Sequence, residues 1–138
     1  MQEPPTELPG RDGLGELIGL EYLDTGPDEI RARVEVTDDL RQPVGLVHGG
    51  VFCVIAESMC SAATWLAVHG DEMAAMGQSN QATFLRPITA GHVNAVAWPR
   101  HRGRTTWVWD VEITDDEDRT CALIRMTVAV RPAERVAP

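Results

Sequence analysis

The longest apolar run in the chain covers residues 49–68 and contains one charged side chain, Glu57. Its length and composition predict a helix that begins at Gly49, has His69 in its last turn and stops at Gly70. A helix without a polar face is buried on most sides, so we expect this one to lie largely inside the fold. A carboxylate in such surroundings is costly unless it is paired or hydrogen-bonded, which marks Glu57 as a candidate working residue.

Shorter segments on both sides of this run show the two-residue period of half-buried strands. The alternation is clearest at residues 30–35, where Ile30, Ala32 and Val34 alternate with charged side chains. Strands are predicted at residues 19–24, 29–36, 77–86, 91–101, 105–114 and 119–131, and a short helix at 14–18. The pattern indicates an α+β fold in which an antiparallel sheet of about six strands wraps around one long central helix.

The length of 138 residues fits one domain. We expect a disordered, proline-rich arm at residues 1–12, the folded domain at 13–132 and a frayed tail at 133–138. The acidic start resembles no secretory signal, so we expect a soluble cytoplasmic protein. The run at 49–68 is nearly long enough to span a membrane, but Glu57 and several hydroxyl side chains interrupt it, which favours a core helix. The acidic turn at residues 115–118 is expected to be a solvated hairpin tip.

The net charge is −9, and all twelve basic residues are arginine. An acidic surface argues against sequence-independent binding to nucleic acid, and the lack of lysine excludes Schiff-base chemistry. The three cysteines are expected to be reduced, and a Cys53 or Cys60 nucleophile has no credible partners. Neither they nor the histidines have metal-ligand spacing, so we expect no metal and no cofactor.

The start of the predicted helix and Glu57 together supply the minimum for acyl transfer. The backbone N–H groups of Gly49 and Gly50 can stabilise a developing oxyanion, and Glu57 can act as base or nucleophile. Ser61 lies one turn later on the same face, within reach of the carboxylate. Gly49 and Glu57 are about 12 Å apart along a helix, so one carbonyl cannot contact both. Either they serve different purposes, or two chains each supply one, in a dimer with antiparallel helices.

Gln42-Pro43, His48-Gly49-Gly50, Glu57 and Ser61, in this order and spacing, resemble the hotdog-fold acyl-CoA thioesterases. The similarity includes the segments at residues 77–87 and 99–105 and covers about residues 14–131. It is nearest to the phenylacetate-pathway and 4-hydroxybenzoyl-CoA enzymes with a helix glutamate and to the 1,4-dihydroxy-2-naphthoyl-CoA thioesterases.

The resemblance implies a role for each matched position. Glu57, from the neighbouring subunit, attacks the thioester or activates water, and the Gly49 N–H polarises the carbonyl. Gln42 and His48 orient the thioester, and Ser61 holds Glu57 or the water. It further implies contacts to substrate or CoA from these residues: Gly50, Thr83, His101, Arg102, Gly103, Arg104 and Thr105. The implied assembly is a dimer or a dimer of dimers, a homotetramer.

Two other functions fit the same pattern. One is an enoyl-CoA hydratase or dehydratase on the same fold, and the other is a non-catalytic acyl-CoA-binding domain. Release of free thiol from acyl-CoA separates both from a thioesterase. Trp98, Trp107 and Trp109 could line an aromatic acyl pocket, but tryptophans on strand faces are more often core or subunit contacts.

Overall fold

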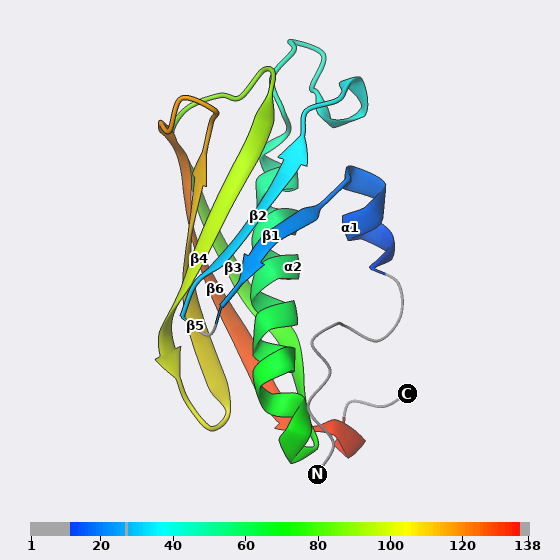
Figure 1. The fold of residues 1–138 in the computed structure, drawn as a ribbon, viewed down its shortest axis with the longest axis vertical. Coiled ribbons are helices and arrows are strands. Elements are labelled where there is room, and N and C mark those ends of the chain that lie inside the picture. Colours follow the sequence, from blue (N-terminus) through cyan, green and yellow to red (C-terminus); the bar gives the residue numbers. More distant parts are fainter. Residues whose placement is uncertain (1–11, 27, 136–138) are drawn as a thin grey trace.

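The computed structural model describes residues 12–26 and 28–135, in which a long helix lies against one antiparallel sheet (Figure 1). The helices are α1 (Gly13–Ile18) and α2 (Gly49–Val68), and 3₁₀ turns lie at η1 (Asp38–Leu40), η2 (His69–Asp71) and η3 (Ala133–Arg135). The strands are β1 (Glu21–Thr25), β2 (Ile30–Glu35), β3 (Met73–Phe84), β4 (His92–Arg102), β5 (Thr106–Thr114) and β6 (Thr120–Pro132). Their order in the sheet is β1-β2-β4-β5-β6-β3, so β1 and β3 are the two edges.

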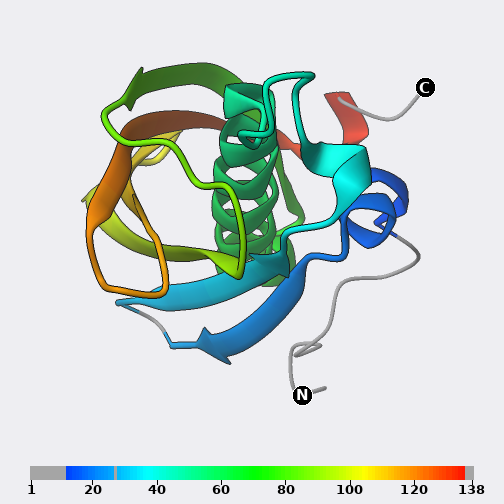
Figure 2. The same ribbon diagram turned by 90° about the horizontal axis from the view of Figure 1, so that it is seen from above.

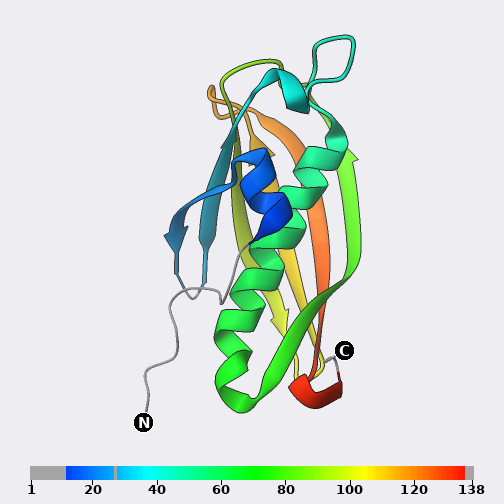
Figure 3. The same ribbon diagram turned by 90° about the vertical axis from the view of Figure 1, so that its right-hand side faces the viewer.

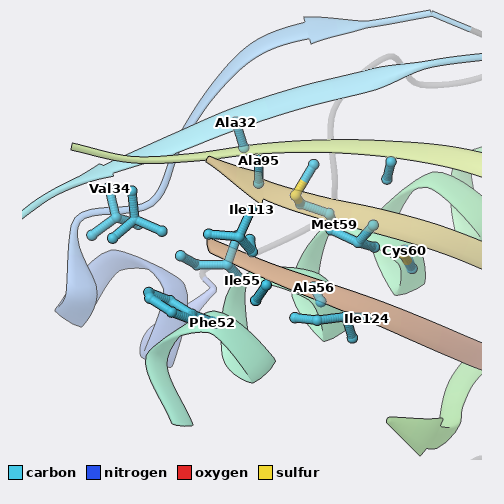
Figure 4. Packing of buried hydrophobic residues seen from close by; sticks show 14 of the residues in the cluster. Ala32, Val34, Phe52, Ile55, Ala56, Met59, Cys60, Ala95, Ile113 and Ile124 are labelled. Carbon is cyan, nitrogen blue, oxygen red and sulfur yellow. The ribbon is translucent and has the colours of Figure 1, made fainter. Parts of the chain in front are cut away.

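The sheet curves around α2 when viewed from above, and α1 lies across the helix from the sheet (Figure 2). Alternate residues of the four central strands point at the helix because successive strand side chains face opposite sides. Figure 4 shows Phe52, Ile55 and Met59 of α2 packed toward Val34 of β2 and Ile113 of β5. Trp109 is 2% exposed and donates through Nε1 to the hydroxyl of buried Thr64, at 3.0 Å. The predicted α+β architecture is therefore confirmed.

The helix is less enclosed than its composition predicts. It has the predicted bounds, but only about half of its most apolar stretch is buried in the fold. Gly50 and Glu57 are exposed, and Cys53 and Ser61 are only partly buried. The expectation of a largely buried helix is therefore wrong, because the sheet covers one side and α1 covers only part of the other. We call the residues Gly50, Cys53, Glu57 and Ser61 the open face of α2.

The connection from α2 to β3 also differs from the prediction. Gly70 does not terminate the helix. The chain continues from α2 through η2 and turns at Glu72, whose φ of 59° is left-handed. This turn sends the chain directly into β3, which begins at Met73, four residues before the predicted start. A register shift between Gly77 and Ser79 interrupts the pairing of β3 with β6.

Residues 1–11 of the predicted arm and 136–138 of the predicted tail lie outside the described residues. Within the tail, Ala133–Arg135 forms a 3₁₀ turn. The region Gly49–Asp71 is long and apolar enough to cross a membrane by length and hydropathy, and here it packs as the core helix of the fold.

The acidic turn after β5 is not simply solvated, because Asp115 is 7% exposed and organises it. Its Oδ1 accepts hydrogen bonds from the backbone N–H groups of Glu117 and Arg119, and its Oδ2 pairs with the Arg119 guanidinium at 2.7 Å. Burial alone would raise the pKa of Asp115, but these hydrogen bonds from Arg119 and Glu117 outweigh it and lower that pKa. The turn is thus held by one carboxylate.

Candidate active site

The loop before α2 is fixed by backbone hydrogen bonds that set where the helix begins. The N–H of Gln42 donates to the Leu46 carbonyl at 2.7 Å, which closes a tight turn, and the N–H of His48 donates to the Leu40 carbonyl at 3.0 Å. The Val47 N–H reaches across to the Ile88 carbonyl at 2.9 Å. These contacts place Gln42 beside the first turn of the helix. The His48 side chain is exposed at the N-cap position and makes no capping hydrogen bond.

The first turn of α2 presents free backbone donors. No acceptor for the N–H groups of Gly49 and Gly50 lies among the described residues, and the first turn holds no acidic side chain. Free N–H groups at the start of a 20-residue helix, together with the helix dipole, favour negative charge at this point. This arrangement can stabilise an oxyanion.

A pocket of about 330 Å³ opens at this end of the helix. Its walls are mainly apolar, with the Gln42 amide and the Arg86 guanidinium as polar groups. The lining residues are Gln42, Leu46, Val47, Gly49, Phe52, Phe84, Leu85, Arg86 and Pro87. Gly49 is closely covered, since a Cβ built on it would lie 2.6 Å from Cζ of Phe84. We call this space the Gly49 pocket.

Glu57 lies on the open face of α2 and is exposed, contrary to the expectation of a buried carboxylate. Its side chain lies over Gly77 of β3, where an added Cβ would come within 2.7 Å of Oε1. Among the described residues it has no hydrogen-bond or ion-pair partner, and Ser61 is near in the helix without being bonded to it. Eight residues separate Glu57 from Gly49, about 12 Å along the axis. Within one chain the two groups therefore do not share a substrate carbonyl.

Cys53 lies between these two groups, and its surroundings do not favour a nucleophile. Burial, and then the nearby charge of Glu57, raise the pKa of the Cys53 thiol. Burial also raises the pKa of Cys60. Asn80 of β3 donates from Nδ2 to the Cys53 carbonyl at 2.9 Å, but its own Oδ1 is buried and finds no donor among residues 12–26 and 28–135. This acceptor lies where β3 meets the open face of α2.

The end of β4 and the residues that connect it to β5, together called the β4–β5 turn (residues 101–105), carry five of the predicted substrate contacts, at the opposite end of the sheet from the start of α2 (Figure 1). Gly103 is required there, because a Cβ would lie 2.6 Å from the Thr106 carbonyl oxygen and 2.7 Å from Nε2 of His101. Arg102 pairs with Asp28 at 2.9 Å and lies over the Trp107 ring at 5.6 Å. Arg104 is exposed and has no partner in the described part of the chain.

The remaining predicted residues separate into two places. Gly50 is on the open face, and a Cβ on it would meet nothing within 4 Å. Thr83 points to the outer surface of the sheet, in a hollow with Trp98 and Leu123 that faces away from α2. The structure therefore brings together Gln42, His48 and Gly49 but places Thr83 and the β4–β5 turn elsewhere in the same chain. Trp109 is buried in the core and Trp98 lies in the outer hollow, so neither of them lines the Gly49 pocket.

Three residues at the site were not singled out from the sequence: Gly77, Phe84 and Arg86. Arg86 is exposed beside the pocket and has no acidic partner within ion-pair distance among the described residues. The strand order would have indicated it, since β3 ends next to the start of α2 (Figure 3). No group of three histidine, cysteine or acidic side chains that could hold a metal occurs within the described residues.

Comparison with known proteins identifies the class of this chain. The model of the thioesterase superfamily matches residues 44–122. The Mycobacterium tuberculosis protein Rv1847, which is named as an esterase, is 44% identical over 107 residues, 76% of each chain. The 1,4-dihydroxy-2-naphthoyl-CoA hydrolase of Escherichia coli is 35% identical over 121 residues, 86% of this chain and 88% of the enzyme.

A solved structure agrees in fold as well as in sequence. A variant of thioesterase PA1618 from Pseudomonas aeruginosa superimposes with a TM-score of 0.84 at 35% identity. The match covers 88% of this chain and 87% of the other. The similarity thus extends over most of the fold.

Proposed function

The chain belongs to the thioesterase superfamily and is a thioester hydrolase, and from this premise we propose that it cleaves an aryl- or acyl-CoA to the free acid and CoA. The observation that carries the proposal is the Gly49 pocket, where Gly49, whose backbone N–H is unpaired, lines a mainly apolar space that also holds the Gln42 amide and the Arg86 guanidinium. The tetrahedral state of thioester hydrolysis places negative charge on the former carbonyl oxygen. Donors already aligned for that charge lower the barrier.

Glu57 supplies the second group that the reaction needs. As a nucleophile, its carboxylate attacks the carbonyl carbon, the CoA thiolate leaves, and water hydrolyses the resulting anhydride. As a general base, it takes a proton from water that attacks instead, and the proton passes to the departing thiolate. Both routes release one acid and one thiol. Gln42 and His48 orient the thioester, and Ser61 holds the carboxylate or the water.

The catalytic carboxylate of each site comes from a second copy of the chain. The 12 Å between Gly49 and Glu57 supports this arrangement, because antiparallel helices bring Glu57 of one copy to Gly49 of the other. The open face of α2 and the uncovered edge of β3 are both on the surface that such a copy would cover. The assembly is a dimer or a dimer of dimers, and we place it in the cytoplasm.

The same arrangement accounts for the position of the β4–β5 turn. Antiparallel pairing moves the partner's turn from the far end of the sheet toward the Gly49 pocket. Arg104, which has no acidic partner, then meets the phosphates of CoA, with contacts from His101, Arg102, Gly103 and Thr105. Arg86 adds a second unpaired cation beside the pocket. Gly50 adjoins the thioester, and Thr83, on the outer surface, has no place in this arrangement of two copies.

The experiment is release of free thiol from a panel of acyl-CoAs, followed with a disulfide reagent. The panel contains benzoyl, phenylacetyl, hydroxynaphthoyl and straight-chain esters. We expect turnover by the wild type and a loss of roughly 10²–10⁴-fold in Glu57→Gln, the range for removal of a general base or nucleophile. Glu35→Gln, an exposed carboxylate on β2, is the matched control and should keep full activity.

Three results would contradict the proposal. Full activity in Glu57→Gln would remove the carboxylate from the mechanism. Binding of CoA esters without thiol release would indicate a binding domain, and hydration of an enoyl-CoA without thiol release would indicate a hydratase.

A further inference from the structure

Phe84 is a large apolar side chain that remains 55% exposed although it lies at the proposed reaction centre. It is the last residue of β3, and the far edge of its ring faces Gly49: Cζ, Cε2 and Cε1 lie 2.6, 2.7 and 3.0 Å from the position that a Cβ on Gly49 would occupy. Gly49 has no left-handed φ that would demand glycine. The Phe84 ring, not the backbone conformation, is therefore what excludes a side chain at position 49.

The ring is close enough to contact whatever binds the Gly49 N–H. A carbonyl oxygen accepting from that N–H lies about 2.9 Å from the nitrogen, and the nitrogen is about 1.5 Å from the Cα that the ring covers. The groups on either side of the carbonyl carbon therefore come within van der Waals reach of Phe84. An exposed aromatic ring at this distance forms part of the binding surface.

Phe84 is also one of two aromatic rings in the pocket. Phe52 of α2 is 3% exposed and meets Phe84 edge-to-face, with ring centroids 6.0 Å apart and an angle of 63° between the planes. Phe52 is fixed in the core and packs against Phe84, whereas Phe84 remains largely exposed and lines the pocket. A third ring placed there would complete an aromatic cluster, which adds a favourable interaction that an alkyl chain of equal area does not make.

We propose that Phe84 is a specificity-determining residue whose ring forms the wall of the Gly49 pocket beside the thioester carbonyl and selects a flat, aromatic acyl group. This inference rests on the proposed role of Gly49. In this inference the acyl group of the substrate contacts the end of β3. The catalytic roles proposed for Glu57 and the Gly49 N–H are unchanged.

The test compares benzoyl-CoA with hexanoyl-CoA in Phe84→Ala and Phe84→Leu. We expect the ratio of kcat/KM for the two esters to fall roughly tenfold in Phe84→Ala, and to fall nearly as far in Phe84→Leu, which keeps apolar bulk but has no ring. Leu123→Ala is the matched control, because Leu123 is 50% exposed on the outer surface of the sheet. An equal loss for both esters, or no loss, would overturn the assignment.

A double-mutant cycle tests whether Gly49 and Phe84 act together. A methyl group in Gly49→Ala must turn the Phe84 ring away, so this variant should lose the same aromatic preference. Gly49→Ala/Phe84→Ala should then be no less selective than Phe84→Ala alone. Additive losses would overturn the contact between the two residues.

A binding measurement separates this inference from the proposed function. Phenacyl-CoA is a thioether that cannot be hydrolysed, and its affinity can be compared with that of hexyl-CoA by calorimetry in the Glu57→Gln background. Weaker binding of phenacyl-CoA alone on adding Phe84→Ala supports the inference even if no ester is turned over. Equal affinities with and without Phe84 contradict it even if turnover is normal.

Discussion

The two faces of α2 differ in both composition and surroundings. Phe52, Ile55 and Met59 face the sheet and are 3% exposed or less, whereas Glu57 on the opposite side is exposed. The buried face holds the fold together. The open face has no such task within one chain, and it carries Glu57, which we propose as the catalytic carboxylate. This difference is the basis of our proposal that a second molecule, rather than the chain's own sheet, covers this side of the helix.

The first prediction contrasts the stability supplied by the two faces. Ile55→Ala should lower the free energy of unfolding by about 2–5 kcal/mol, because it leaves a cavity in the densely packed core. Cys53→Ala, on the open face, should cost less than about 1 kcal/mol. Urea denaturation of both variants measures this directly. Equal losses would show that the open face is also part of the core.

The second prediction concerns the glycine beneath Glu57. Gly77→Ala should lower kcat roughly tenfold, because the new methyl group would lie 2.7 Å from Oε1 and displace the carboxylate. The fold should survive, since the displaced atoms are the end of a flexible side chain. Gly70→Ala, where a Cβ meets nothing within 4 Å, is the control for steady-state kinetics. An unchanged kcat in Gly77→Ala would mean that the observed position of Glu57 is unimportant.

The third prediction tests the far end of the sheet. Arg104→Ala should raise KM for CoA esters several-fold with a smaller change in kcat, because a phosphate contact binds the ground state and the transition state alike. The effect should disappear with an acyl-pantetheine thioester, which lacks the nucleotide. Arg31→Ala, an exposed arginine on β2, is the control. A KM for CoA esters that does not change would remove Arg104 from the site.

The smallest effect is expected away from both faces, at the β5–β6 turn. Asp115→Asn should lower the melting temperature slightly at pH 7 and leave kcat unchanged. The folded-state pKa of Asp115 is lowered, so its stabilisation is present above the ordinary pKa of aspartate and is lost as the pH falls through the folded value. The difference in melting temperature between wild type and variant should therefore shrink in acid. A constant difference would contradict the role of the carboxylate charge.

The sequence predicts α2 completely but not how it is covered. A glycine pair followed by a long apolar run with one charged residue defines the helix, and the strand alternation defines β2, β4, β5 and β6. The open face is marked only by the polar side chains of Glu57 and Ser61, which do not stand out against the apolar residues around them. Periodicity reports which residues avoid water, not whether the covering surface belongs to the same chain.

The candidate site was only partly predictable for a similar reason. Gln42, His48 and Gly49 are near one another in sequence, so their proximity follows from the chain itself. Which residues of β3 face the helix does not follow from the chain in this way, because the register shift between Gly77 and Ser79 changes which residues point at the helix. Thr83 consequently lies outside and Phe84 inside, at Gly49. That contact depends on the strand order, which brings the end of β3 beside the start of α2.

The central claim is that each site is shared between two chains, and a mixed dimer tests it most directly. Glu57→Gln and Gln42→Ala chains, each nearly inactive alone, are co-expressed with different tags and the heterodimer is purified through both. If Glu57 serves the partner's Gly49 pocket, one of the two sites is intact, and the heterodimer should recover about half of the wild-type kcat per dimer. Thiol release no faster than in either parent would show that Glu57 acts within its own chain and would contradict the account.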